Sequence, residues 1–321
     1  MNNISIQHIA QKVFQDEINE LAMISSKIND SFSNAIELIL SSRGKIVLVG
    51  VGKSAHIAKK IEATLNSTGA KAQFMHATEA IHGDIGLLNK QDVVICFSKS
   101  GDTPEIKTII NVLKERSLGL IAITGNTQSF LALNADIVLD VTVEKEADTN
   151  NLAPTSSTTA QLVMGDALAI ALSYKNKFNA NDFAMSHPGG VLGKKLLWKV
   201  EDLFDKNQNK PMVNYNQSLS DVIISISSGK KGITAVFKEN RLVGVVTDGD
   251  LRRMLQKQVD LHKITAEDIM SSHPLTIQKT NLALEALNLI KQNAVGQLIV
   301  LDGFDFFGVI DIHSIIKEGI S

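Results

Sequence analysis

Between residues 45 and 141, short apolar runs alternate with segments of helical periodicity. The apolar runs occupy residues 45–50, 71–76, 91–98, 118–125 and 135–141, and helices are predicted over 53–67 and 103–116. A further short helix is predicted between the last two runs. Runs of this length, rich in β-branched residues and separated by helices, are typical of a parallel sheet covered on both faces. The sequence therefore predicts a five-stranded, parallel, doubly wound α/β domain.

Helical segments flank this domain. Apolar residues recur every three or four positions from residue 6 to about residue 40, and a long helix is predicted from about 155 to 175. After Trp198 a polar stretch that contains a proline, 205–217, indicates a linker and the start of a new domain. We place the first domain at 1–204, with a helical N-terminal part over about 1–42, and the linker at 205–210.

The remaining third of the chain contains an internal repeat. Residues 219–255 align without gaps with residues 283–319, so that Gly232 matches Gly296 and Gly244 matches Gly308. Each copy has the pattern helix–strand–strand–helix and is too small to bury its own apolar face comfortably. We therefore predict a tandem α+β module with one copy in 211–267 and the other in 268–321.

The bulk composition excludes several classes of protein. The net charge of −2 and the pI near 6.5 give no electrostatic basis for binding nucleic acid or an anionic membrane. The single cysteine, Cys96, excludes an intrachain disulfide framework, and its apolar surroundings predict a small buried hydrophobe. No apolar run approaches the roughly 20 residues that span a bilayer, and the N-terminus has no signal-peptide pattern. We expect a soluble, cytoplasmic protein.

The loop after the first predicted strand, GVGKS (50–54), at first suggests a nucleotide site. A Walker A loop requires G-x-x-x-x-G-K-[ST], but the position five residues before Gly52 is Val47, so a hydrolase loop is excluded. A dinucleotide fingerprint needs an acidic residue about 20 positions later, and the next strand ends at His76 without one. The remaining interpretations are a ligand-binding loop at a helix N-terminus and a tight turn with an exposed lysine.

A second glycine loop, SKSGDTPEI (98–106), follows the third predicted strand. Hydroxyl groups and backbone amides at the start of a helix suit a phosphate monoester, and Pro104 is well placed for the first helical turn. Because both loops follow strands of one sheet, we predict that they hold a phosphate together. The predicted binding residues of the two loops are Gly50, Gly52, Ser54, Ser98, Ser100, Gly101 and Thr103.

These motifs carry a specific resemblance. The S-x-S-G-x-T loop resembles that of the sugar isomerase (SIS) domain, whose members bind phosphosugars through it, and the C-terminal repeat resembles a pair of CBS domains (a Bateman module). With the segments EAIHGDIG, APTSSTTAQLVMGDALA and SHPGGVLGKKLL, the chain is similar to the arabinose-5-phosphate isomerase family. The likeness covers nearly the whole chain apart from the first forty residues. It implies a flavodoxin-like SIS sheet.

The resemblance implies an aldose–ketose isomerase that interconverts D-ribulose 5-phosphate and D-arabinose 5-phosphate through an enediol. Its implied role is to supply 3-deoxy-D-manno-octulosonate (Kdo) for lipopolysaccharide, and its implied assembly is a homo-oligomer, a tetramer. The reaction needs a base and a group that stabilises the developing oxyanion, and no cofactor or metal. Two alternatives stay open: an isomerase of another phosphosugar, and a non-catalytic regulatory protein that senses a sugar phosphate. The second would not need Lys53, Glu146 and His187 together.

Five side chains are candidates for the chemistry: Lys53, His82, Glu105, Glu146 and His187. Four of them lie at or near carboxyl ends of predicted strands, where an open α/β sheet binds its ligand. His187 follows the long helix, so it must fold back or come from a neighbouring subunit; the resemblance implies that it is catalytic. We expect His187 and Glu146 to share acid/base work and Lys53 and His82 to stabilise the enediolate. Glu105 would position a hydroxyl or serve as an alternative base.

Three of these assignments have a structural alternative. His187 could cap the turn that follows it, Glu105 could be an ordinary acid in the first turn of a helix, and Glu146 could be a solvated charge. The segment 148–151, DTNN, departs from the family pattern beside the expected site. Ser156 and Ser157, at the start of the long helix, are expected to help hold the phosphate and sugar.

The resemblance also implies adenine-nucleotide binding between the CBS repeats, through a G-h-x-T-x-x-D pattern. The first repeat has this pattern, with Thr247 and Asp250 as the predicted ligand contacts. In the second repeat these positions are Asp311 and Ser314, so we expect at most one such site. Two expectations stay open for the module: it binds a nucleotide or a CMP-Kdo-type regulatory ligand, or it has a structural or dimerising role.

Overall fold

The computed structural model describes residues 5–204, 209–256 and 260–321. The chain divides into two compact units, the first ending at Ser186 and the second beginning at His187. This division falls before the predicted domain end at residue 204, because the segment 187–204 packs on the second CBS repeat. There Val200 N donates to Asn281 O, and Ala283 N donates to Trp198 O. Most of the predicted linker, 205–208, lies outside the described residues.

The first unit is built around a five-stranded parallel sheet of order β2-β1-β3-β4-β5. The strands are β1 (Ile46–Gly50), β2 (Ala72–His76), β3 (Val93–Ser98), β4 (Gly119–Thr124) and β5 (Ile137–Asp140). Each lies inside one of the predicted apolar runs. This strand order is that of flavodoxin-like folds. The predicted parallel, doubly wound α/β sheet is confirmed.

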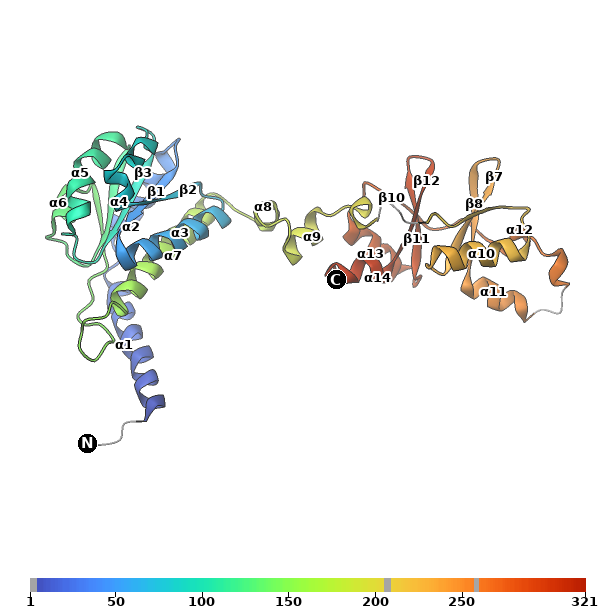
Figure 1. Ribbon diagram of the computed structural model, residues 1–321, viewed down its shortest axis with the longest axis horizontal. Helices are drawn as coiled ribbons and strands as arrows, with labels where there is room; N and C mark the ends of the chain where they lie inside the picture. The colour runs from blue at the N-terminus through green and yellow to red at the C-terminus, as the bar shows by residue number, and fades with distance from the viewer. Residues whose placement is uncertain (1–4, 205–208, 257–259) are drawn as a thin grey trace. The chain divides into compact units, whose positions relative to one another are not determined.

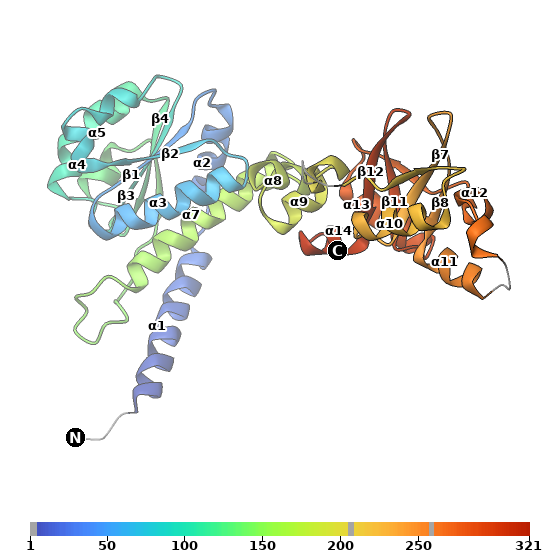
Figure 2. The ribbon, with the colours of Figure 1, turned by 45° about the vertical axis from the view of Figure 1, so that its right-hand side comes forward.

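Helices cover both faces of this sheet (Figures 1 and 2). One face packs against α1 (Ile6–Ser26), α2 (Asp30–Ser41), α3 (Gly52–Ser67) and α7 (Ser156–Lys175), and the other against α4 (Ala77–Ile81), η1 (Asp84–Leu87), α5 (Pro104–Arg116) and α6 (Phe130–Asn134). Successive strand residues alternate between these two cores: Ile95 lies in the first, Cys96 in the second. Burial raises the pKa of the Cys96 thiol to about 12, which confirms the predicted buried hydrophobe.

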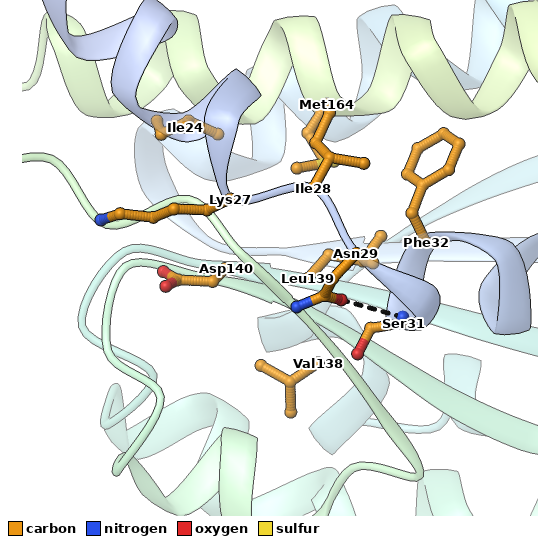
Figure 3. A pocket seen from close by; sticks show the side chains of 10 residues that line it. All are labelled: Ile24, Lys27, Ile28, Asn29, Ser31, Phe32, Val138, Leu139, Asp140 and Met164. Atoms are coloured by element: carbon orange, nitrogen blue, oxygen red, sulfur yellow. Dashed lines mark hydrogen bonds between the residues drawn. The ribbon is translucent and has the colours of Figure 1, made fainter.

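The predicted N-terminal helical region is divided into two helices by a short turn. Asn29 begins α2 by accepting a hydrogen bond from Ser31 N at 2.9 Å, the capping bond drawn in Figure 3. The turn lies beside the edge strand β5, and Lys27 and Asp140 line the crevice between them (Figure 3). This crevice has a volume of about 40 Å³. It is too small for a sugar phosphate, because ligand pockets usually measure about 300–1,000 Å³.

The second unit holds the repeat. Its elements are α9 (Val191–Leu197), η2 (Val200–Leu203), β6 (Met212–Asn214), α10 (Leu219–Gly229), β7 (Ile233–Lys238), β8 (Arg241–Thr247), α11 (Asp248–Leu255), η3 (Leu261–Lys263), α12 (Ala266–Ile269), β9 (Ser271–Ser272), β10 (Thr276–Gln278), α13 (Ala283–Gln292), β11 (Gln297–Asp302), β12 (Asp305–Asp311) and α14 (Ile312–Lys317). They form a four-stranded sheet, β6-β7-β8-β9, and a three-stranded sheet, β10-β11-β12. A last short helix of the first unit, α8 (Ala180–Ser186), precedes them. The predicted tandem α+β module is confirmed.

The two repeats share backbone detail as well as sequence pattern. The β7–β8 ladder has a bulge between Val236 and Phe237, and the β11–β12 ladder has one between Val300 and Leu301, 64 residues later in each case. The inner faces of both repeats build one common core, in which Phe237 and Phe306 lie 5.6 Å apart between ring centroids. Within the described ranges, no helix combines the length and apolar character that a membrane span requires.

Asp92 holds the amino end of β3, at the sheet edge opposite the predicted site. Its buried carboxylate accepts hydrogen bonds from Lys45 N at 2.9 Å and from Asn89 N at 3.1 Å. Replacing Asp92 with alanine leaves these partly buried amides without their acceptor and leaves a cavity at a buried position, so we expect the free energy of unfolding to fall by about 1–3 kcal/mol. Urea denaturation measures this, with Asp84→Ala, which truncates an exposed aspartate, as the control. Equal loss in both variants would contradict the role given to Asp92.

Candidate active site at the carboxyl edge of the sheet

The strand order creates a crevice between β1 and β3. The chain leaves β1 toward one face of the sheet through α3 and leaves β3 toward the other through α5, so the loops diverge. Ligands of open α/β sheets bind outside the carboxyl ends of the strands at such a point. A pocket of about 360 Å³ lies here, and the beginnings of α3, α5 and α7 line it.

The first loop contributes Lys53 and Ser54 to the pocket lining. Gly52 has φ +59°, in the left-handed region that favours glycine. At Gly50 a Cβ would lie 3.0 Å from Ala55 N, so this glycine allows α3 to begin close to β1. No side chain of the described residues caps α3. Its first amides and the ammonium group of Lys53 make this wall favourable for an anion.

The second loop is held in shape by its own hydroxyl groups. Ser98 Oγ and Thr103 Oγ1 lie 2.9 Å apart, and Ser98 Oγ also accepts a hydrogen bond from Gly101 N at 3.1 Å. Gly101 has φ +67°, and a Cβ there would overlap the side chain of Ser129. Ser98, Ser100 and Thr103 line the pocket. As at α3, the start of α5 carries no side-chain cap from the described part of the chain, so a phosphate is well suited to this position.

Glu146 lies behind the side of the pocket formed by the start of α7, and it is 3% exposed. Its carboxylate accepts hydrogen bonds from Thr155 N at 2.9 Å, from Ser157 N at 3.0 Å and from Ser157 Oγ at 2.5 Å, and Lys99 Nζ lies 2.5 Å from it. Burial acts to raise the pKa of this carboxyl group, but the bonds from Lys99, Ser157 and Thr155 outweigh it and lower the pKa to about 2. Glu146 is therefore a buried, paired anion, and the alternative of a solvated charge is excluded.

The low pKa bears on the acid/base role predicted for Glu146. A carboxylate with a pKa near 2 accepts a proton poorly at neutral pH, since an efficient base has a pKa near the working pH. Its bonds instead cap the start of α7 and fix Ser157 and Lys99, both of which line the pocket. The geometry favours a positioning role for Glu146 over proton transfer.

The segment that carries Glu146 is itself fixed by hydrogen bonds. Glu20 of α1 is 2% exposed, and its carboxylate accepts Glu144 N at 2.8 Å and Lys145 N at 3.2 Å. Asn151 Oδ1 accepts Glu146 N at 2.7 Å. Asn151 belongs to the segment 148–151, so this segment directly supports the pose of Glu146. The N-terminal helix, which lay outside the sequence resemblance, thus helps to build the site.

Three polar residues of the pocket were not predicted: Lys99, Thr158 and Gln161. Lys99 lies inside the predicted phosphate loop, but its side chain turns to Glu146, a contact between segments 47 residues apart. Gln161 follows Ser157 by four positions on the predicted long helix, so helical periodicity places both on one face. That spacing was the available signal for Gln161.

Several predicted residues lie elsewhere. His82 is exposed at the end of α4, Glu105 is half-buried in the first turn of α5, and Ser156 is buried at the start of α7; none of them lines the pocket. His187 belongs to the second unit, in the turn before α9, where its carbonyl accepts a hydrogen bond from Gly190 N at 3.1 Å. Within one chain, the structure thus brings Lys53, Glu146 and the loop hydroxyls together.

The second unit has a cleft of about 330 Å³ to which both repeats contribute, and Thr247, Asp250 and Gln297 are among its lining residues. Thr247 and Asp250 form a capping box for α11: Asp250 Oδ2 accepts Thr247 Oγ1 at 2.6 Å. Arg253 lies 2.6 Å from the other carboxylate oxygen. Burial acts to raise the pKa of Asp250, but the bonds from Thr247 and Arg253 outweigh it and lower this pKa.

In the second repeat, the residue equivalent to Thr247 is Asp311, whose carboxylate is bonded to other residues of the module. Asp311 caps α14 by accepting Ser314 N at 2.7 Å, and its carboxylate pairs with the ammonium group of Lys231 from the first repeat. Lys231 Nζ also donates to Ser314 Oγ at 2.6 Å. The charge of Asp311 is therefore balanced by a lysine of the other repeat.

The Glu146 bonds predict a pH-dependent effect on stability. Replacing Glu146 with glutamine removes the ion pair with Lys99, so we expect the free energy of unfolding at pH 7 to fall by about 1–3 kcal/mol. Because the folded-state pKa is lowered from the usual 4.5 to about 2, the contribution of the carboxylate is present above pH 4.5 and is lost as the pH falls toward 2. The gap between wild type and variant should therefore shrink over that range.

The measurement is denaturant unfolding of both proteins from pH 7 downwards. Glu144→Gln is the matched control, because Glu144 is an exposed acid two positions away. A gap that widens on acidification, or an equal effect of Glu144→Gln, would contradict the buried ion pair.

Comparison with known proteins confirms the resemblance drawn from the motifs. Residues 39–171 match the family model of the SIS domain, and residues 200–257 and 266–321 match that of the CBS domain. Over 320 residues the chain is 43% identical to the arabinose 5-phosphate isomerase KdsD of Pseudomonas aeruginosa, covering 99% of this chain and 98% of that protein. Over 315 residues it is 42% identical to KdsD of Shigella flexneri, covering 98% and 96%.

A solved structure extends this likeness to three dimensions. A protein of Escherichia coli CFT073, solved in complex with arabinose 5-phosphate, is 41% identical with a TM-score of 0.56, and the match covers 59% of this chain and all of that one. The family models, the relatives and the solved structure all indicate the same family. This chain, a SIS domain followed by two CBS domains, belongs to the arabinose 5-phosphate isomerase family.

Proposed function

We propose that this protein is an aldose–ketose isomerase that interconverts D-ribulose 5-phosphate and D-arabinose 5-phosphate through an enediol intermediate. The observation that carries the proposal is the pocket at the β1/β3 crevice, where α3 and α5 begin without side-chain caps from the described residues. Lys53 and Lys99 add positive charge to its lining. The relatives at 42–43% identity over nearly the whole chain are named arabinose 5-phosphate isomerases, and the E. coli neighbour holds arabinose 5-phosphate.

The lining of the pocket suggests where the phosphate and the sugar of the substrate bind. Phosphate binds at the starts of α3 and α5, with Ser54, Ser98, Ser100 and Thr103 around it, because helix N-termini stabilise anions. The sugar then extends toward α7. Lys53 stabilises the enediolate oxygen electrostatically. His187 transfers the proton between C1 and C2, and Glu146 keeps the wall formed by α7 in place. His82, as a second stabilising group, and Glu105, as the alternative base, lie outside the pocket of their own chain and would act on it from a neighbouring subunit.

The protein acts as a homo-oligomer, a tetramer in this proposal. Support comes from apolar surface that a single chain leaves exposed: Phe14 of α1 is 73% exposed, and Ile170 and Tyr174 of α7 are 61% and 84% exposed. The last two line an apolar groove of about 590 Å³ between α2 and α7. Exposed apolar patches of this kind are typical of protein–protein interfaces.

The proposed setting is the cytoplasm, where the product enters Kdo and lipopolysaccharide synthesis. The name KdsD of the relatives supports this place in metabolism. A nucleotide or a CMP-Kdo-type ligand is proposed for the cleft at Thr247 and Asp250 of the CBS module. Its volume of about 330 Å³ is compatible with a small ligand.

The reaction itself is tested by incubating the protein with D-ribulose 5-phosphate in deuterium oxide and following the products by proton NMR. Proton transfer through an enediol introduces solvent deuterium at C2, so we expect D-arabinose 5-phosphate deuterated at that carbon. Formation of ribose 5-phosphate would identify a different phosphosugar isomerase. The lack of any exchange would favour the alternative of a sugar-phosphate sensor.

The catalytic role of His187 is tested with two variants. We expect His187→Ala and Lys53→Ala each to lower kcat by about 100-fold or more, because each removes a group that acts on the reacting carbons. If His187 acts on the pocket of a neighbouring subunit, mixing the two inactive variants and allowing subunits to exchange restores part of the activity. If it acts within its own chain, mixing restores none. Near-normal turnover of correctly folded His187→Ala would refute the assignment.

A further inference from the structure

Gln161 is a buried polar residue that the fold does not satisfy. It lies on α7, is 1% exposed and lines the candidate pocket. Its side-chain oxygen, Oε1, is fully buried, and no group in the described part of the chain donates a hydrogen bond to it. Leaving a buried acceptor unpaired costs about 1–3 kcal/mol, and native proteins seldom do so without a reason.

Gln161 differs from the hydroxyl groups of the second loop and of α7 that line the pocket, because those hydroxyl groups have hydrogen-bond partners. Ser98, Ser100 and Thr103 form hydrogen bonds within their own loop or with each other. Ser157 donates to Glu146, and Thr158 donates to the carbonyl oxygen of Thr155 at 2.9 Å. The position of Gln161 is thus fixed by the helix, and none of these neighbouring side chains donates a hydrogen bond to its Oε1 atom.

The position of Gln161 indicates which part of a ligand it meets. The starts of α3 and α5 carry no side-chain cap from the described residues, whereas the start of α7 is occupied by the Glu146 carboxylate. An anionic phosphate is therefore favoured at α3 and α5 and repelled at α7. A ligand that spans the pocket presents its uncharged part to α7, one turn beyond Ser157, where Gln161 lies.

We propose that Gln161 is a specificity-determining residue whose carboxamide accepts a hydrogen bond from a hydroxyl group of the sugar phosphate. This inference rests on the proposed function for the identity of the sugar. A buried acceptor aimed at a substrate hydroxyl discriminates strongly, because a ligand without that hydroxyl leaves the acceptor unpaired. Gln161 selects a polyhydroxylated chain at this position and disfavours a phosphate ester with an apolar tail.

The central test is Gln161→Met, which keeps the length of the side chain and removes its polar atoms. We expect kcat/KM for D-arabinose 5-phosphate to fall by about tenfold or more. We expect the melting temperature to stay the same or to rise, because replacing an unsatisfied polar group by an apolar one of similar shape does not destabilise a fold. Gln91→Met changes an exposed glutamine at the opposite edge of the sheet and should alter neither quantity.

Substrate analogues identify the hydroxyl. Arabinose 5-phosphates that lack the C3 or the C4 hydroxyl keep the C1–C2 chemistry, so both can still be isomerised. We expect one of them to lose about tenfold or more in kcat/KM with the wild type, and to lose little with Gln161→Met. The inference would be overturned if each analogue lost as much kcat/KM with Gln161→Met as with the wild type. Unchanged kcat/KM of Gln161→Met for D-arabinose 5-phosphate would also overturn it, as would a marked fall in the melting temperature of this variant.

Failure of the proposed function has a different signature. A wild type that turns over neither pentose phosphate refutes the isomerase, and calorimetric binding then decides the role of Gln161. The expected result is that Gln161→Met weakens the binding of D-arabinose 5-phosphate and leaves that of inorganic phosphate unchanged. Equal binding of the sugar phosphate by wild type and variant, or binding by neither, would overturn the inference.

Discussion

The candidate site depends on one buried carboxylate that stays ionised. Glu146 combines hydrogen bonds from the start of α7 with an ion pair to Lys99 of the phosphate loop, and thereby joins two segments that no strand or helix connects. A buried charge is tolerated only when it is paired and hydrogen-bonded. Because its partners are pocket residues or their neighbours, the requirement to satisfy this charge also sets the geometry of the site.

This arrangement extends outward to the N-terminal helix. Glu20 holds the backbone of residues 144 and 145, and Asn151 holds the amide of Glu146 itself. A helix that lies far from the ligand-binding loops in sequence therefore contributes to their rigidity. Sites whose contacting residues are supported by a second layer of hydrogen bonds keep their geometry more accurately than sites on free loops.

The fold was predictable from sequence because its signals are local. Apolar runs for β1 to β5 and the helical periodicity of α3, α5 and α7 gave the parallel sheet, and glycines next to hydroxyl residues marked the two ligand loops. What the pattern did not reveal depends on contacts between distant segments. The ionisation of Glu146 follows from Lys99, 47 residues away in sequence, and the hydrogen-bonding state of Gln161 follows from the packing around α7. The spacing of residues along the sequence indicates neither of these two properties. The role of His187 stays a prediction, since it belongs to the other compact unit.

The ion pair between Lys231 and Asp311 gives the CBS module a property that the duplicated backbone alone would not have. The two copies match down to their bulges, yet the cap of the second copy is neutralised by a residue of the first. The halves of the duplication are therefore chemically interdependent. A change at Lys231 would leave the Asp311 carboxylate of the other repeat without this counter-charge, so a substitution in one copy acts on the chemistry of the other.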